Sequence, residues 1–231
     1  MNPTPSPPPQ QQSTRVWDLP TRLFHWSLLA CVVGCFACAK VGGDAMRWHF
    51  YFGYAVLILL IFRIVWGFVG NRYARFASFL PNPLAALRTL KGGAAPHLGH
   101  NPLGAFSVYA LLGALAFQAC SGLFSNDDIA SEGPWMVKVS KELSDQITSW
   151  HKINEKIIIV LVLLHIAALI YHRVVKKERL VAAMVTGDKS APISADAAQT
   201  LAAQDHAALR WRGLAVLLAA AGAVWVLVNK V

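Results

Sequence analysis

Charged residues are scarce in this 231-residue chain, in which Asp, Glu, Lys and Arg make up only 14% of the residues and 55% are hydrophobic. A soluble domain usually carries roughly 25% charged residues, so the composition excludes an ordinary water-soluble protein. Acidic residues are the rarer kind, 12 against 21 basic ones. Cysteine is scarce too. Three of the four cysteines lie in one apolar run, which excludes a disulfide framework.

Long apolar runs dominate the sequence instead. A helix needs about 20 mainly apolar residues to cross the hydrocarbon core of a membrane. We therefore predict an all-α membrane protein: a disordered tail over 1–14, a four-helix bundle over 15–187, a polar linker over 188–210 and an additional transmembrane helix in 211–231. Five segments meet the length requirement: 23–39, 50–69, 103–124, 157–175 and 214–228.

Basic residues indicate how these segments are oriented. If the segments alternate in direction, the basic clusters near 15–22, 72–91, 173–189 and 210–212 all lie on one side. The segment 125–150, which is net acidic, lies on the other. The positive-inside rule then places the N-terminus in the cytoplasm and the C-terminus outside. Because the basic excess belongs to this orientation, the predicted partner is the lipid bilayer and no nucleic acid is expected.

Five of the eight histidines lie within or at the ends of the apolar segments, where ionisable side chains are rare and usually mark a functional pathway: His25, His49, His151, His165 and His172. His172 is expected at the inner surface among basic residues, which leaves four. His151 and His165 are 14 residues, or two heptads, apart on one helix, so they face the same seam about 21 Å from each other. His25 and His49 differ in depth by about 18 Å. The depths predict two pairs, His49 with His151 near the outer face and His25 with His165 near the inner face.

Pairs of histidines point to haem. Haem iron needs two axial ligands because the porphyrin fills its other positions, whereas zinc needs four ligands or three plus water. Cys35 and Cys38 are followed by Ala39 and not by His, which excludes covalent c-type attachment. The sequence therefore predicts two haem b groups.

Two residues of the second segment are consistent with haem. Arg63 repeats the 14-residue offset from His49, and a haem propionate is a natural partner for a buried arginine. The alternative is that its side chain extends to the inner interface. Gly53, one turn after His49, would leave clearance for a flat macrocycle, or it is an ordinary small residue at a helix contact.

The chain resembles the bacterial di-haem cytochrome b561 family, which includes the cytochrome b subunits of nickel–iron hydrogenases. The resemblance covers about residues 15–187, and the fifth segment lies outside it. It rests on VWDLPTRLFHW at 16–26, RIVWGFVG at 63–70, YARF at 73–76, GHNPLG at 99–104, GLF at 122–124, and the spacing of His151 and His165.

This resemblance implies a four-helix bundle with two b haems on His25, His49, His151 and His165. It also implies electron transfer in the bacterial inner membrane between quinone and a periplasmic partner, which is a dehydrogenase subunit or a cytochrome c. An electron-transfer subunit is favoured over a stand-alone superoxide:quinone oxidoreductase, because the outer segment is net acidic. The direction of electron flow and a homodimer are left open.

Two other readings of the polar residues are weaker. Metal transport would require acidic residues within the spans, and 50–69 and 103–124 contain none. His100 and Tyr73 could handle protons for a quinone on the inner side, but ordinary loop roles are favoured for both.

Overall fold

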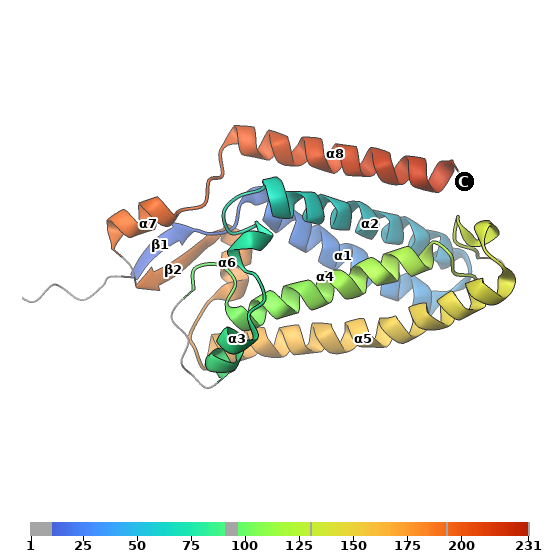
Figure 1. Cartoon of the computed structure of the whole chain (residues 1–231), viewed down its shortest axis with the longest axis horizontal. Coiled ribbons are helices and arrows are strands. Elements are labelled where there is room, and N and C mark those ends of the chain that lie inside the picture. The colour runs from blue at the N-terminus through green and yellow to red at the C-terminus, as the bar shows by residue number, and fades with distance from the viewer. Residues whose placement is uncertain (1–10, 91–96, 130, 193, 231) are drawn as a thin grey trace, which may run out of the picture.

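The computed structural model describes residues 11–90, 97–129, 131–192 and 194–230, which form an elongated helical bundle (Figure 1). Five helices are long and apolar enough to cross a membrane, which confirms the prediction of an all-α membrane protein. They are α1 (Leu19–Val41), α2 (Met46–Val69), α4 (Pro102–Gly122), α5 (Lys141–Val174) and α8 (Ala207–Asn229). The remaining elements are short: β1 (Gln11–Arg15), η1 (Gly43–Ala45), η2 (Phe76–Ser78), α3 (Pro83–Leu90), η3 (Met136–Lys138), α6 (Leu180–Thr186), β2 (Asp188–Pro192) and α7 (Ala195–Leu201).

Local sequence signals set where the long helices begin. Asp18 and Asn101 cap α1 and α4, because each side chain accepts a hydrogen bond from the backbone N–H three residues on. In both helices a proline follows within the first turn, where its missing N–H costs nothing. Ser140 caps α5 in the same way, so that helix begins 16 residues before the apolar run that predicted it.

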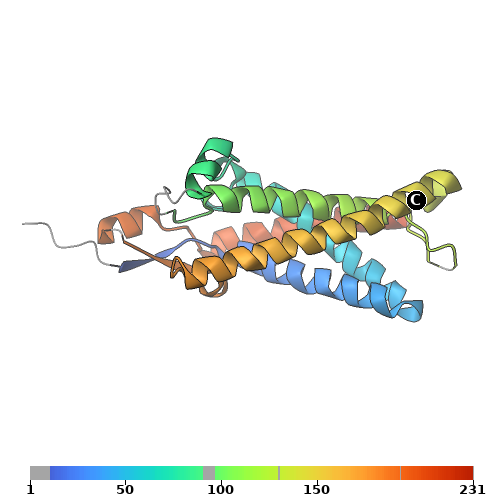
Figure 2. The same ribbon diagram turned by 90° about the horizontal axis from the view of Figure 1, so that it is seen from below.

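The helices pack as two antiparallel pairs joined through α2. Helix α1 packs on α2 and α4 packs on α5, while α2 also contacts α4 on one side and α8 on another. Figure 2 shows the same bundle turned by 90°. The outward faces of the long helices carry many exposed large apolar side chains, such as Leu163 and Leu164, as expected for helices that lipid surrounds.

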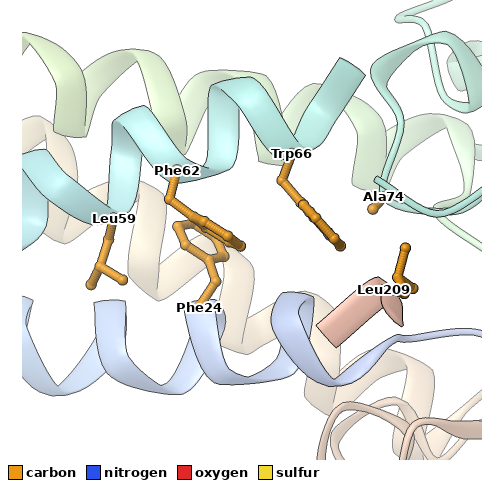
Figure 3. Close-up of a cluster of buried hydrophobic side chains, with 6 residues drawn as sticks. All are labelled: Phe24, Leu59, Phe62, Trp66, Ala74 and Leu209. Carbon is orange, nitrogen blue, oxygen red and sulfur yellow. The ribbon is translucent and has the colours of Figure 1, made fainter. Parts of the chain in front are cut away.

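Buried apolar clusters connect these helices. One cluster joins α1, α2 and α8, and in it the rings of Phe62 and Trp66 stack 5.6 Å apart (Figure 3). Trp66 has no exposed surface. A second cluster joins α2, α4 and α5 through Leu60, Leu115 and Ile158. Since α2 contributes to both, it is the central helix of the molecule.

One end of the bundle, here called the sheet end, carries β1, β2, α6 and α7 (Figure 1). β1 and β2 pair antiparallel, with Gln11 opposite Pro192 and Arg15 opposite Asp188. Residues 11–14 belong to the segment expected to be disordered, and β2 and α7 belong to the segment expected to be a linker. Both expectations rested on composition. Composition cannot show that two polar segments pair when, like Arg15 and Asp188, they are 173 residues apart in the sequence. Residues 1–10 of the expected tail lie outside the described residues.

Asp205 ties the sheet end to the bundle. Its carboxylate forms ion pairs with Arg15, Arg22 and Arg210 at 3.1, 3.6 and 3.0 Å. It also accepts a hydrogen bond from the backbone N–H of Leu19. Burial would raise the pKa of Asp205, but these hydrogen bonds and positive charges hold the pKa below its usual value.

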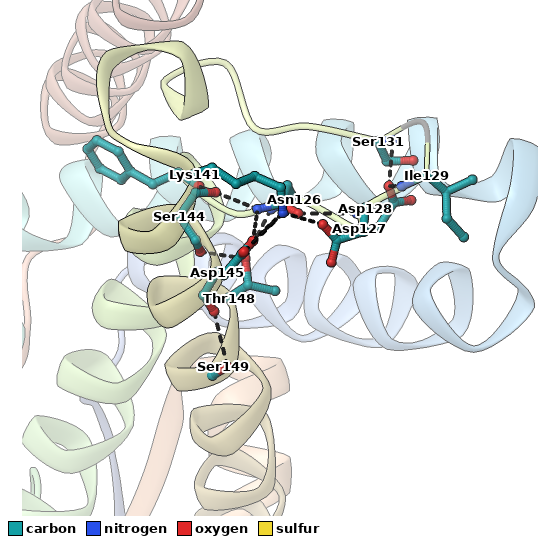
Figure 4. A network of polar contacts seen from close by, with 11 residues as sticks. Asn126, Asp127, Asp128, Ile129, Ser131, Lys141, Ser144, Asp145, Thr148 and Ser149 are labelled. Atoms are coloured by element: carbon teal, nitrogen blue, oxygen red, sulfur yellow. Dashed lines mark hydrogen bonds and ion pairs between the residues drawn. The ribbon is translucent and has the colours of Figure 1, made fainter.

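The opposite end, here called the loop end, is organised by Asn126 (Figure 4). Its side-chain amide donates to Ser144 Oγ at 2.6 Å and to Asp145 Oδ1 at 2.9 Å, and its backbone N–H donates to Thr148 Oγ1 at 3.0 Å. Ser144 Oγ in turn donates to the Phe124 carbonyl at 2.7 Å. This network fastens the loop after α4 onto the first three turns of α5, the turns that lead to His151.

Candidate haem sites

His49 lies in the first turn of α2, at the loop end, and its ring is oriented by α1. Its Nδ1 is 2.9 Å from the carbonyl oxygen of Cys35. A carbonyl only accepts, so Nδ1 carries the proton in this contact, and the lone pair of the neutral ring is on Nε2. This is the arrangement by which outer hydrogen bonds orient metal-binding histidines.

His151 is oriented by α4 in the same manner. Its Nδ1 is 2.9 Å from Ser121 Oγ, a hydroxyl that donates its proton to the Gln118 carbonyl at 3.1 Å. The hydroxyl therefore accepts from Nδ1–H, and Nε2 again keeps the lone pair. Helix α4 comes this close because residue 122 is glycine: a Cβ there would lie 3.2 Å from His151 Cε1.

The rings of His49 and His151 lie edge-on to each other, with their centres 6.4 Å apart and their planes at 73°. Two imidazoles that bind one metal ion from opposite sides would have ring centres roughly 6.5 Å apart, since each metal–nitrogen bond is roughly 2.1 Å long. The pair that the sequence predicted is thus brought together at a separation that fits axial ligation of one haem iron.

His25 and His165 form the second pair, nearer the sheet end. The two imidazoles, on α1 and α5, lie within range of electrostatic interaction. His25 Nδ1 is buried and has no hydrogen-bond partner, and its ring lies edge-on to Trp26. A buried ring nitrogen without a partner is expensive, so this imidazole fits a site in which a bound cofactor would supply one.

The surroundings of the pairs also fit a flat cofactor. A Cβ built on Gly53, one turn after His49, would meet nothing within 4 Å, so this face of α2 has open space beside it. The described residues contain no group of three or more His, Cys, Asp or Glu able to hold a metal ion. Pairs of ligands suit haem iron, whereas zinc requires more protein ligands.

Arg63 is buried, with 3% of its surface exposed, which rules out the alternative that its charged group reaches the interface. The guanidinium carbon lies 4.7 Å from the centre of the Phe76 ring and 5.9 Å from that of Phe79. In the described part of the chain Arg63 forms no ion pair, and its Nη1 has no hydrogen-bond partner. A buried cation without an anion is costly, so a carboxylate supplied by a cofactor would compensate it.

Several functional contacts could not be found by sequence reasoning. Ser121 precedes His151 by 30 residues, and no local pattern links the two. Phe76 and Phe79, the aromatic neighbours of Arg63, come from the segment after α2. They contact the guanidinium only because this segment folds back onto α2. His100 was favoured as an ordinary loop residue, yet its ring packs between Trp17 and Phe79, at 4.8 and 4.4 Å.

Comparison with known proteins identifies the family. The family described as prokaryotic cytochrome b561 matches residues 16–187, which include all four histidines of the two pairs. The chain belongs to this family. This cytochrome b561 is therefore a multi-pass membrane protein, a b-type haem cytochrome of electron transfer. The match ends before α7 and α8, so the fifth spanning helix lies outside the family region.

Curated relatives of this cytochrome b561 carry one description. The chain is 24% identical over 215 residues to a protein of Rhizobium leguminosarum bv. viciae described as a probable Ni/Fe-hydrogenase B-type cytochrome subunit, with 78% of this chain and 90% of the relative covered. A protein of Azotobacter chroococcum with the same description is 26% identical, with 77% and 89% covered. The probable Ni/Fe-hydrogenase 1 B-type cytochrome subunit of Escherichia coli K12 is 26% identical, with 76% and 90% covered. No solved structure matches this cytochrome with statistical significance.

Proposed function

We propose that this cytochrome holds two haem b groups, one on His49 and His151 and one on His25 and His165. It transfers electrons between a periplasmic redox partner and quinone in the bacterial inner membrane. The haems, when bound, supply one-electron transfer, while the protein supplies axial ligands, position and local charge. Arg63 is the proposed partner of a propionate of the second haem.

The observation that carries the proposal is the geometry of His49 and His151. Their ring centres are 6.4 Å apart, and both Nδ1 atoms are engaged by other helices, which leaves both Nε2 lone pairs for a metal. Each histidine lies on a different long helix, so the pair bridges α2 and α5 at the loop end.

The proposed partner follows from the relatives. Those named above are described as cytochrome subunits of hydrogenases, which supports a redox enzyme as the neighbour of this chain. A dehydrogenase of this kind or a cytochrome c would dock at the loop end. Quinone is soluble in the membrane and can reach the second haem from the side.

The arrangement of charge supports the orientation. The sheet end carries Arg15, Arg22 and Arg210, whereas the segment that forms the loop end contains Asp127, Asp128 and Asp145. By the positive-inside rule the sheet end and the N-terminus are cytoplasmic, and the loop end and the C-terminus are periplasmic.

A haem count tests the ligand pairs directly. The protein is purified in mild detergent, and the dithionite-reduced minus air-oxidised spectrum is combined with a pyridine haemochrome count. Two haem b per chain are expected for the wild type and one for each single His→Ala variant. His49→Ala with His151→Ala should still bind one haem, because both changes remove the same site, whereas His49→Ala with His165→Ala should bind none.

The matched control is His97→Ala, a change of an exposed loop histidine that should leave two haems. A wild-type protein that stays colourless although haem is supplied during expression would refute the proposal. Reduction of the haems by a short-chain quinol then tests quinone as the substrate.

The stand-alone superoxide:quinone oxidoreductase is the weaker candidate. It requires basic side chains at the loop end to attract the superoxide anion. Lys141 is a basic side chain there, but it is paired with Asp128 and with Asp145, the latter at 2.8 Å. Superoxide consumption by the purified protein, measured with quinone present, distinguishes the two functions.

A further inference from the structure

Two of the buried side-chain nitrogens near the sheet end that have no hydrogen-bond partner belong to side chains that lie against the same aromatic ring. They are Arg63 Nη1 and His100 Nδ1. Both side chains contact the ring of Phe79, His100 at 4.4 Å and the Arg63 guanidinium at 5.9 Å, and the two groups interact electrostatically. Aromatic rings of Trp17, Phe76, Phe79 and Tyr109 surround them, and we call this group the aromatic box.

The charges around the aromatic box indicate which class of ligand it would bind. Burial lowers the pKa of His100 to about 3, and the positive charges of Arg63 and Lys189 act in the same direction. Asp18 interacts electrostatically with Arg63 but forms no ion pair with it among the described residues. Lys189 is itself paired with Glu178 at 3.3 Å, so Arg63 is the cation that lacks an ion pair among the described residues. A site with an unpaired cation and a second buried nitrogen suits an anion of carboxylate type.

The box has the right depth to meet a cofactor held by His25 and His165. His25 lies six residues after the start of α1 at Leu19, and Arg63 lies six residues before the end of α2 at Val69, so both are about 9 Å inside the bundle. His100 immediately precedes Asn101, the residue that caps α4 at the sheet end. The donors therefore lie at the level of the second histidine pair and between it and the sheet end.

We propose that Arg63 and His100 together bind one propionate carboxylate of the haem on His25 and His165. His100 donates one hydrogen bond, Arg63 donates another and supplies the positive charge, and the aromatic box excludes water from both. This inference rests on the proposed function, since it requires that haem. It adds His100, from the loop before α4, to the residues that contact the cofactor.

The test measures haem release. His100→Phe keeps a ring between Trp17 and Phe79 but removes both ring nitrogens. Its rate of haem transfer to an excess of apoglobin is followed by absorbance in the His49→Ala background, which retains only the haem on His25 and His165. Release should be faster by roughly tenfold to a hundredfold, as for the loss of other outer-shell hydrogen bonds. In the His25→Ala background, which retains the other haem, release should not change.

Three further variants sharpen the test. His97→Phe, in the same loop, should release haem as the parent does. Arg63→Gln should act like His100→Phe, and the double variant should show less than the sum of the two effects on the logarithm of the rate, because both groups bind one carboxylate. Arg63→Lys keeps the charge and should restore part of the retention.

The outcomes separate this inference from the proposed function. A wild-type protein without two haems would refute the proposed function itself. With two haems present, unchanged release in His100→Phe overturns the inference, and so does equally accelerated release from both sites, which would mean a general loss of packing. Unchanged release with a raised KM for a short-chain quinol also overturns it, because the box would then bind the quinone headgroup.

Discussion

At the loop end, a hydrogen bond to Nδ1 of each histidine ring leaves the Nε2 lone pair available to a metal ion. Cys35 holds His49 through a backbone carbonyl, which cannot be removed by a side-chain change, whereas Ser121 holds His151 through a hydroxyl. The two partners therefore differ in how they can be tested. Only the second can be deleted without moving a ligand.

We expect Ser121→Ala to weaken binding of the haem on His49 and His151 by roughly tenfold to a hundredfold, since outer hydrogen bonds contribute about that much to metal affinity. The other haem should be unaffected. The measurement is haem content after repeated gel filtration in detergent. Ser149→Ala, which removes a hydroxyl from the exposed face of α5, is the control. Equal retention in the two variants would show that Ser121 does not orient His151.

A prediction at the same scale concerns Asp205 and pH. Because the folded-state pKa of Asp205 is held below the usual value of about 3.9, its contribution to stability is complete above that pH and is lost as pH falls toward the folded-state pKa. Asp205→Asn should cost about 2 kcal/mol of unfolding free energy at pH 6, less than for a fully buried pair. The difference from wild type should shrink toward pH 3.

Thermal unfolding in detergent between pH 3 and pH 6 measures this effect. Asp44→Asn, at the loop end, is the control, because Asp44 forms no ion pair among the described residues. A difference between Asp205→Asn and wild type that stays constant over the pH range would contradict the assigned role of the carboxylate.

At the scale of whole elements, α8 poses the sharpest question, because it lies outside the family region yet packs along α2. Its contact depends on Gly213, where a Cβ would lie 2.9 Å from Pro20 Cγ on α1. Gly222, nine residues further along α8, would meet nothing within 4 Å. Near the C-terminus, the indole N–H of Trp135 donates to the Leu227 carbonyl at 2.8 Å, which fastens α8 to the loop end as well.

These two glycines give a matched pair of variants. Gly213→Leu should destabilise the protein by about 1–3 kcal/mol, the usual cost of overpacking a tight contact. Gly222→Leu should be close to neutral or slightly stabilising, since leucine favours the helix more than glycine does. Both are measured by thermal unfolding in the same detergent. Similar unfolding temperatures for the two would mean that α8 does not pack on α1 and α2 as described.

The whole molecule makes the orientation testable. An alkaline phosphatase fused after Val231 should be active, because the proposed orientation puts the C-terminus in the periplasm, where that enzyme folds. The same reporter fused after Leu90, at the end of α3, should be inactive. The opposite pattern of activities would reverse the proposed orientation of the bundle.

Spacing and apolar run length were sufficient to predict the helices and the pairing of His49 with His151, because a helix converts residue number into depth. The sequence did not reveal the two-stranded sheet or the aromatic box. Arg15 and Asp188 are 173 residues apart, and Arg63 meets Phe76 through a turn, so neither contact leaves a local periodicity. Composition also did not show that residues 188–210, predicted as a polar linker, contain β2 and α7.

The strand pairing at the sheet end has a consequence for how the chain is assembled in the membrane. β1 precedes the first crossing and β2 follows the fourth, so the two can meet only if the number of crossings between them is even. A chain in which one helix failed to insert would leave the strands on opposite sides of the bilayer. The pairing of β1 with β2 is therefore compatible with four complete crossings between them and incompatible with three.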